Sequence, residues 1–244
     1  MIPSSHPRHE SLKTRELLER GVAMGITSLN GLIAHGRGEA FDYLLGEKTH
    51  GFAQDAINVS SAMLLLAKHP VISVNGNTSA LVPKELVVLS NILDAPLEVN
   101  LFHSSQERLK KIKEVLVRHD GKRILLPNKK YRMKYLASNR KFVNKNGILK
   151  ADVVLVPLED GDRTEALIKN NKKVITIDLN PLSRTAQHAT VTIVDNVVRS
   201  ISHLIKTAKK YKKLDTAQLR RIIEQFDNKK NLKNALKCIY QNLT

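Results

Sequence analysis

A single cysteine, Cys238, excludes an intrachain disulfide and a metal site built from several cysteine thiolates. Long apolar runs are missing as well. The longest, such as residues 62–67, are far shorter than the roughly 20 residues that a membrane-spanning helix requires. The first residues contain no apolar run behind an early charge, which argues against a secretory signal. We therefore expect a cytoplasmic protein, and its 244 residues are enough for one large α/β domain or two small ones.

The motifs of several well-known enzyme classes are also absent. No G-x-x-x-x-G-K-[ST] sequence occurs, which argues against a P-loop fold, and no G-x-G-x-x-G follows the first predicted strand. The chain has neither the G-x-S-x-G nor the H-E-x-x-H sequence of common hydrolases. Its nine histidines are scattered, without the spacing of a metal site.

Positive charge is abundant, and the formal net charge is +17. Residues 101–150 hold 15 Lys and Arg against 3 Asp and Glu, and residues 200–244 hold 11 against 3. Such a surplus indicates either nucleic-acid binding or a solvated lysine-rich surface. The basic stretch has only Tyr131 and Tyr135 for base stacking, so we favour the solvated surface and expect no specific nucleic-acid partner.

The pattern of apolar residues predicts helices first and then strands that alternate with helices. The early helices are predicted at 10–24 and 52–68. Strands are predicted at 71–75, 97–102, 123–126, 152–156, 173–177 and 190–194. The later helices are predicted at 83–93, 104–120, 163–170, 196–211 and 215–243, the second of them opened by a capping box at Ser104. Residues 127–150 have no clear pattern and indicate a mobile excursion or a short hairpin.

Apolar strands that alternate with helices are typical of a parallel sheet covered on both faces. The predicted fold class is therefore a doubly wound α/β fold with helical additions at both ends. We expect one compact unit with three regions. They are an N-terminal helical region (1–70) that contributes to the active site, an α/β core (71–200) and C-terminal helices (201–244).

Polar residues follow four of the predicted strands. They stand in the segments 75–78, 158–164, 178–184 and 195–196, which are rich in Asn, Asp and Gly. Ligands of open parallel sheets bind beyond the carboxyl ends of the strands, so these residues predict a shared polar site. The alternative is ordinary turn chemistry, because Asn, Asp and Gly favour turns for local reasons.

Gly36 and Gly38 flank Arg37. In a loop, this arrangement would let backbone amides face an anion while Arg37 binds phosphate. The alternative is a flexible loop with a surface arginine. His35 is a catalytic candidate, although a lone histidine is as often structural. The residues by themselves thus indicate an α/β protein that binds a phosphorylated ligand.

Long segments of the chain resemble one protein family. They are SHPRHESLKTRE (5–16), GLIAHGRGEAFDYLLGE (31–47), VISVNGNTSALVPKE (71–85), KADVVLVPLEDGDRTEALI (150–168) and VITIDLNPLSRTAQHATVTIVDN (174–196). In this order they resemble the archaeal phosphopantothenate synthetases, also called 4-phosphopantoate–β-alanine ligases. The resemblance covers about residues 4–230 and is poorest over 120–147, where nothing is carried across.

The resemblance implies a Rossmann-like homodimer that activates a carboxylate with ATP and Mg²⁺ during coenzyme A biosynthesis. In the implied reaction, 4-phosphopantoate forms an acyl-adenylate with release of pyrophosphate, and the amine of β-alanine then displaces AMP. The nucleotide contacts implied by matching motifs are Arg15, Arg37, Asp178, Leu179, Asn180, Arg184, Thr185, Asp195, Asn196 and Val197.

Three further assignments are our own hypotheses. Asn75, Gly76 and Asn77 would bind the phosphate of phosphopantoate or the carboxylate of β-alanine. Asp160 and Asp162 would hold the metal or receive the amine, and Arg163 would bind a carboxylate or phosphate. Arg37, His35, Asp160 and Asp162 are thus the catalytic candidates. The alternative for residues 160–163 is a capped helix start, because Asp stabilises a helix N-terminus without any ligand.

A different class of function also fits the strand-end residues. A nucleotide- or NAD-binding module whose basic tail docks on nucleic acid would need similar Asn, Gly and Asp residues. The response of ATP turnover to β-alanine separates the two, because an unrelated module should show none.

Overall fold

The computed structural model describes residues 3, 5–158 and 161–242. Its main sheet has six parallel strands in the order β3-β2-β1-β6-β7-β8. Their bounds are β1 Pro70–Val74, β2 Leu97–Val99, β3 Ile124–Leu125, β6 Val153–Pro157, β7 Lys173–Ile177 and β8 Val191–Ile193. The order runs outward from β1 in one direction and from β6 in the other, as in Rossmann-type folds. The predicted fold class is confirmed.

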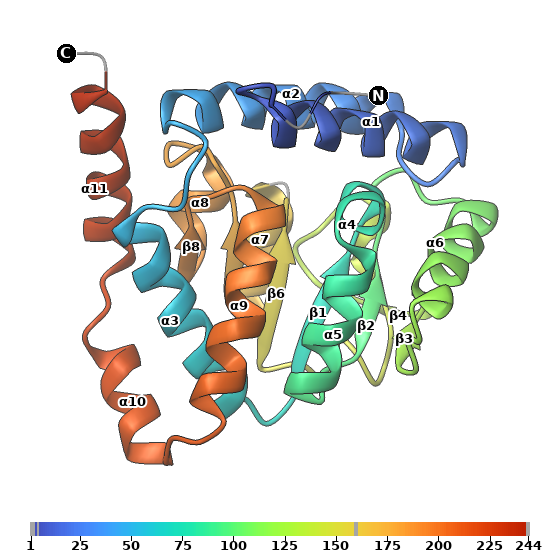
Figure 1. Ribbon diagram of the computed structural model, residues 1–244. Helices are drawn as coiled ribbons and strands as arrows, with labels where there is room; N and C mark the ends of the chain where they lie inside the picture. The colour runs from blue at the N-terminus through green and yellow to red at the C-terminus, as the bar shows by residue number, and fades with distance from the viewer. Residues whose placement is uncertain (1–2, 4, 159–160, 243–244) are drawn as a thin grey trace.

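Apolar residues on alternate strand positions face two different cores, as the two-residue period of a strand requires. Ile72 and Val74 belong to the larger core, whereas Val71 belongs to a second core on the other face. Three helices, α3 (Gly51–Leu66), α5 (Pro83–Leu93) and α9 (Val197–Tyr211), lie side by side over the face of the larger core (Figure 1).

The remaining helices cover the edges and the second face. Helix α6 (Gln106–Arg118) packs beside α5, and α7 (Gly161–Lys169) contributes Leu167 to the second core. The C-terminal segment forms two helices, α10 (Thr216–Glu224) and α11 (Asn228–Gln241). They are separate because Asp227 is the N-cap of α11 and starts a second helix there. None of the described helices is long and apolar enough to cross a membrane.

The predicted capping box at Ser104 is wrong by one residue. Ser105 is the N-cap of α6, and its hydroxyl accepts a hydrogen bond from the backbone N–H of Arg108. The sequence offers two adjacent serines, and only the backbone conformation selects between them.

The N-terminal helices α1 (His9–Ala23) and α2 (Leu29–Leu44) run across the edge of the sheet where the strands end (Figure 1). Short helices α4 (Gly76–Leu81) and α8 (Arg184–His188) begin close to the ends of β1 and β7. The carboxyl edge of the sheet is therefore roofed by helix rather than open.

The segment 127–150 is a packed hairpin, so the second of its two predicted alternatives is confirmed. Strands β4 (Asn128–Arg132) and β5 (Phe142–Val143) pair antiparallel, and a short 3₁₀ helix, η1 (Asn139–Lys141), precedes β5. Met133, Val143 and Ile148 are buried in the second core. The hairpin thus takes the place of a covering helix on that face.

A buried carboxylate fixes the hairpin segment to the sheet. Glu98 on β2 has no exposed surface, and it accepts hydrogen bonds from the backbone N–H groups of Asn144 (2.9 Å) and Ile148 (2.6 Å). Asn100, which follows β2, donates its amide N–H to the carbonyls of Arg140 (3.2 Å) and Phe142 (3.0 Å). Two polar residues of one strand end therefore determine where this segment lies.

We expect Glu98 to make stability depend on pH. Burial raises the pKa of Glu98 to about 7, and its two N–H donors and the charge of Arg163 offset this only in part. The folded state therefore binds a proton that the unfolded state has lost. The stability from Glu98 is fully present below about pH 4.5 and is lost as the pH rises through 7, by up to about 3 kcal/mol.

Urea unfolding at several values between pH 5 and pH 8 measures this effect. The Glu98→Gln variant should lose most of the pH-dependent fall that the wild type shows. Glu114→Gln, which makes the same change on the exposed surface of α6, serves as the matched control. Identical pH slopes in the wild type and Glu98→Gln would contradict the prediction.

Candidate active site

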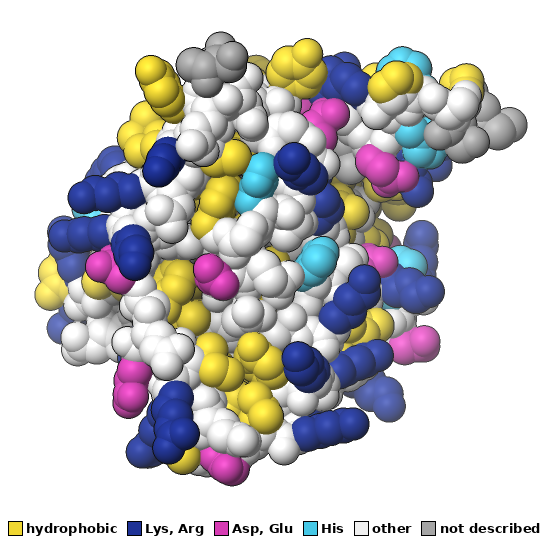
Figure 2. Space-filling model, turned by 60° about the vertical axis from the view of Figure 1, so that its left-hand side comes forward, with side chains coloured by type: hydrophobic (Ala, Val, Ile, Leu, Met, Phe, Trp, Pro, Cys, Tyr) yellow, Lys and Arg dark blue, Asp and Glu magenta, His cyan; other side chains and the backbone are white. Residues whose placement is uncertain are grey.

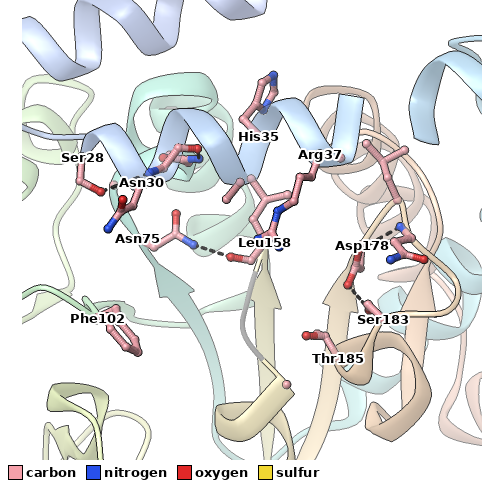
Figure 3. A pocket seen from close by; sticks show the side chains of 18 of the residues that line it. Ser28, Asn30, His35, Arg37, Asn75, Phe102, Leu158, Asp178, Ser183 and Thr185 are labelled. Carbon is pink, nitrogen blue, oxygen red and sulfur yellow. Dashed lines mark hydrogen bonds between the residues drawn. The ribbon is translucent and has the colours of Figure 1, made fainter. Parts of the chain in front are cut away.

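A cavity of about 930 Å³ lies under α2, above the ends of β1, β6 and β7 (Figure 3). The strand order reverses between β1 and β6, and ligands of doubly wound folds bind at this point of the sheet. The cavity is within the size range of sites for small molecules and cofactors.

The cavity brings together most of the residues that the sequence singles out. On its wall lie His35, Arg37, Asn75, Gly76, Asn77, Asp162, Asp178, Leu179, Asn180, Arg184 and Thr185. Outside its wall lie Arg15, Arg163, Asp195, Asn196 and Val197. Asp160 is outside the described residues. The nucleotide contacts expected for the residues outside the wall stay predictions.

The predicted glycine loop around Arg37 is wrong, because Gly36 and Gly38 lie within α2. Their amides are therefore part of the helix and are not available to an anion. The prediction for the Arg37 side chain does not depend on the loop. Arg37 extends from α2 toward the strand ends beside Leu158 (Figure 3), and no carboxylate of the described residues lies within ion-pair distance of it.

His35 borders the same cavity, but its ring points away from the strand ends (Figure 3). Its Nε2 atom is buried and has no hydrogen-bond partner among the described residues. Burial lowers the pKa of His35, and the charge of Arg15 lowers it further against the opposing effect of Glu39. A neutral ring turned away from the cavity favours the structural alternative, and the catalytic role stays a prediction.

Asn75 and Asn77 use their side-chain amides within the protein. Asn75 caps α4 and donates to the carbonyls of Pro157 (3.1 Å) and Leu158 (2.9 Å), which joins the ends of β1 and β6. Asn77 donates to the carbonyl of Gly31 in α2 (2.8 Å). These hydrogen bonds make both side chains part of the scaffold of the cavity, so contacts with a substrate would come from other atoms of this wall.

The end of β6 has strained backbone. Leu158 has a φ of 55°, a left-handed conformation that costs a bulky residue about 1 kcal/mol or more. Its carbonyl accepts the hydrogen bond from Asn75, and its N–H donates to the carbonyl of Ile177 (3.1 Å). The two neighbouring strand ends hold this conformation on the cavity wall.

Asp178 supplies an acceptor at the end of β7. Its carboxylate accepts hydrogen bonds from the Ser183 hydroxyl and from the backbone N–H of Asn180. Burial raises the pKa of Asp178, and these donors together with the charge of Arg37 oppose the rise. The side chain is thus a partly buried acceptor that faces Arg37 across the cavity.

The start of α7 approaches α8 closely. A Cβ atom at Gly161 would overlap the side chain of Arg184, so only glycine fits there. Arg184 itself pairs with Glu165 (2.7 Å). Arg163 is only 1% exposed and donates to the Ser73 hydroxyl (3.0 Å), so it lies beneath the cavity instead of lining it. Asp162 is the α7 carboxylate on the wall.

The charged groups on the described wall are mostly cationic. The described wall has four arginines and two carboxylates. The arginines are Arg37, Arg108, Arg140 and Arg184, and the carboxylates are Asp162 and Asp178. A concave surface with excess positive charge raises the local concentration of anions. The described residues contain no group of three or more His, Cys, Asp or Glu that could hold a metal ion by themselves.

Comparison with known proteins supports this interpretation. The family model described as "Phosphopantothenate/pantothenate synthetase" matches residues 52–242. The chain is 52% identical over 244 residues to a protein of Thermococcus onnurineus named 4-phosphopantoate–β-alanine ligase. This alignment covers 100% of this chain and 94% of that protein. Proteins with the same name from Thermococcus kodakarensis and Methanosarcina mazei are 51% and 49% identical, and the alignments cover 100% and 99% of this chain and 94% and 95% of theirs.

The chain belongs to the phosphopantothenate synthetase family. The resemblance stated from the sequence motifs is confirmed. The family model begins at residue 52, but the similarity to the three relatives extends through α1 and α2.

In this chain, a largely buried ionic cluster anchors the C-terminal end of α2. Arg199 of α9 pairs with Asp42 of α2 (2.5 Å) and with Asp195 (2.6 Å). Asn196 donates to Asp42 (3.1 Å), and Thr49 donates to Asp195 (2.6 Å). Two of the residues expected to contact the nucleotide, Asp195 and Asn196, are therefore engaged in holding the roof of the cavity.

The sequence analysis missed several polar, aromatic and charged residues of the wall. Among them are Ser28, Asn30, Phe102, His103, Arg108 and Arg140. The sequence did contain a signal for Phe102 and His103, because they follow β2. Ligands bind beyond the carboxyl ends of parallel strands, and this strand-end rule applies to β2 as well. Arg108 and Arg140 gave no signal, since they lie in the lysine-rich part of the chain where arginines suggest a solvated surface.

We expect Asp42→Asn to destabilise the protein by about 3 kcal/mol, because it leaves Arg199 partly buried with one of its two carboxylates lost. For a chain of this size the melting temperature should fall by about 6–12 °C. Differential scanning calorimetry measures the change.

Glu16→Gln is the matched control, since it removes a carboxylate from the exposed pair with Arg20. Exposed pairs contribute roughly 0–1 kcal/mol, so this variant should melt close to the wild type. A similar small shift in both variants would show that the ionic cluster does not anchor α2.

Proposed function

We propose that this chain is an ATP-dependent ligase that condenses 4-phosphopantoate with β-alanine to 4′-phosphopantothenate in coenzyme A biosynthesis. The observation that carries the proposal is the arginine-lined cavity at the carboxyl edge of the sheet, in a chain that is about half identical over its full length to proteins named 4-phosphopantoate–β-alanine ligase. Both ATP and the phosphorylated acid are anions that such a wall suits.

The proposed reaction has two steps. A carboxylate oxygen of 4-phosphopantoate bonds to the α-phosphorus of ATP, and the bond to pyrophosphate breaks. The uncharged amine of β-alanine then bonds to the acyl carbon, AMP leaves with the electron pair of the broken bond, and the amine nitrogen loses a proton. Arg37 and Arg184 would stabilise the negative charge on the phosphates, and Asp178 would accept a hydrogen bond from the nucleotide.

Mg²⁺ fits this wall as an ion bound mainly through the phosphates of ATP. It usually binds proteins through one or two carboxylates and retains several waters, so it does not need a cluster of acidic residues. Asp162 is a carboxylate in a suitable place, and Asp160 stays a second prediction. When bound, the ion would neutralise charge on the phosphates.

We also propose a homodimer, in which α2 contributes to the contact. Leu29, Ile33 and Tyr43 of α2 are 68%, 66% and 63% exposed. Burial of apolar surface favours association, by roughly 25 cal/mol per Å² removed from water. If α2 of each copy both covers its cavity and contacts the other copy, the N-terminal region 1–70 contributes to the active site and to the dimer.

The basic surplus needs no nucleic-acid partner. Figure 2 shows Lys and Arg side chains around much of the rim of one face, with Asp and Glu side chains among them. Mixed charges of this kind are typical of a solvated surface. Membership of the synthetase family does not favour the rival binding module.

The first test is a product assay with ATP, Mg²⁺, 4-phosphopantoate and β-alanine. We expect AMP and pyrophosphate, formed only when both organic substrates are present, because the adenylate route consumes the α-phosphate bond. ADP and phosphate would keep the ligase activity but replace the adenylate with an acyl phosphate. No turnover with any combination would refute the proposed function.

Replacement of Arg37 tests whether this side of the cavity wall binds the nucleotide. We expect Arg37→Ala to raise the KM for ATP roughly 10- to 100-fold through loss of a charge-assisted hydrogen bond to phosphate. Its melting temperature should hardly change, since the side chain is exposed and makes no ion pair among the described residues. Arg20→Ala on α1, outside the cavity wall, is the control. Unchanged kinetics in Arg37→Ala would remove this residue from the site.

A further inference from the structure

The cavity has a second basic region on the β2 side of the sheet. Sheet order β2-β1-β6-β7 separates the loop after β2 from the nucleotide residues after β7 by three strand spacings, about 14 Å. The loop after β2 contributes Phe102 and His103 to the wall, and Arg108 and Arg140 lie on the same side. A ligand at Asp178 would leave this side of the cavity for a different group.

Among the described residues, two backbone carbonyls hold the Arg108 guanidinium in place. Its Nη1 donates to the carbonyl of His103 (2.6 Å) and its Nη2 to that of Ile26 (2.8 Å). Its Nε is buried and has no hydrogen-bond partner among the described residues. Burial lowers the pKa of Arg108, and no nearby carboxylate of the described chain opposes this. The guanidinium is thus fixed and charged, and no carboxylate of the described residues pairs with it.

Gly76 at the start of α4 lies against the backbone that holds this guanidinium. A Cβ atom at Gly76 would lie 3.0 Å from Nη2 of Arg108 and even closer to the carbonyl oxygen of Ile26. Gly76, predicted to bind substrate, therefore allows α4 to pack closely against the Ile26 carbonyl that accepts the hydrogen bond from Arg108.

Arg140 reaches the same region from the hairpin segment. It is 7% exposed, and its guanidinium lies 5.8 Å from the centre of the Phe102 ring. Its carbonyl accepts the hydrogen bond from Asn100, so the strand end that carries the loop also fixes η1. Two arginines from separate parts of the chain are thereby positioned on one wall.

We propose that Arg108 and Arg140 bind the phosphate monoester of the acid substrate and so select the phosphorylated acid over its free alcohol. The proposal rests on the proposed function, which places the carboxylate of this acid near the nucleotide. The acid then lies across the ends of β1 and β6, with its phosphate on the β2 side and its carboxylate toward β7. A phosphate dianion supplies a negatively charged partner, which Arg108 lacks among the described residues. The paired N–H donors of a guanidinium match the spacing of phosphate oxygens.

Equilibrium binding and kinetics together test the assignment. Isothermal titration calorimetry would measure 4-phosphopantoate and pantoate binding to the wild type and to Arg108→Gln and Arg140→Gln. We expect each variant to bind 4-phosphopantoate roughly 10- to 100-fold more weakly, with pantoate binding nearly unchanged. In the ligase assay, the KM for 4-phosphopantoate should rise by a similar factor, whereas the KM for ATP and for β-alanine should not.

Controls separate this role from a purely structural one. Arg118→Gln removes an exposed arginine from the last turn of the same helix and should change none of these constants. If Arg108→Gln does not fold, Arg108→Lys keeps the charge but loses the fork, and it should show a smaller, still selective loss. Parallel loss of ATP and 4-phosphopantoate affinity would indicate a structural role and overturn the proposal.

The remaining outcomes are also decisive. A rise in the KM for β-alanine alone would assign the two arginines to the amino-acid carboxylate and overturn the proposal. Equal affinities of wild type and variants for 4-phosphopantoate would do the same. If the wild type shows no ligase activity, the proposed function fails, and the calorimetric comparison of the two acids still decides whether this region binds a phosphate.

Discussion

The position of α2 over the carboxyl edge of the sheet is the constraint on which the cavity depends. One end of this helix is held by the hydrogen bond from Asn77 to Gly31, and the other by the ionic cluster of Asp42, Arg199 and Asp195. A parallel sheet by itself offers only a shallow crevice at its switch point. The anchored helix converts this crevice into a roofed cavity and brings Arg37 to face Asp178. Where the two anchors lie therefore determines which strand ends share one binding site.

Most of the fold could be predicted from the sequence because apolar strands and helices differ in period. Strand β7 matches its predicted bounds, and the other strands of the main sheet differ by a few residues. The failures have local causes. Gly36 and Gly38 each disfavour a helix by about 1 kcal/mol, so that region was expected to be a loop, but contacts over the strand ends override the preference. The hairpin strands are mostly polar on the surface, and their few buried residues show no period.

The site could be predicted only in part, because the strand-end rule gives location but not the direction of a side chain. It found Asn75 and Asp178, yet one of them bonds to neighbouring strand ends and the other remains an acceptor at the cavity. Arg140 could not be found this way. Its place depends on buried contacts between β2 and a segment about 40 residues later, and no local pattern reveals such contacts.

The ionic cluster that anchors α2 also constrains when the cavity can form during synthesis. Asp42 and Arg199 are separated by 157 residues, and Asn196 and Asp42 by 154. Contacts between such distant residues close large loops, which is slow and unfavourable until the intervening structure exists. A nascent chain that has not yet reached α9 thus has no partner for the end of α2. The binding site is consequently one of the last features to assemble, although its roof is among the first segments to be translated.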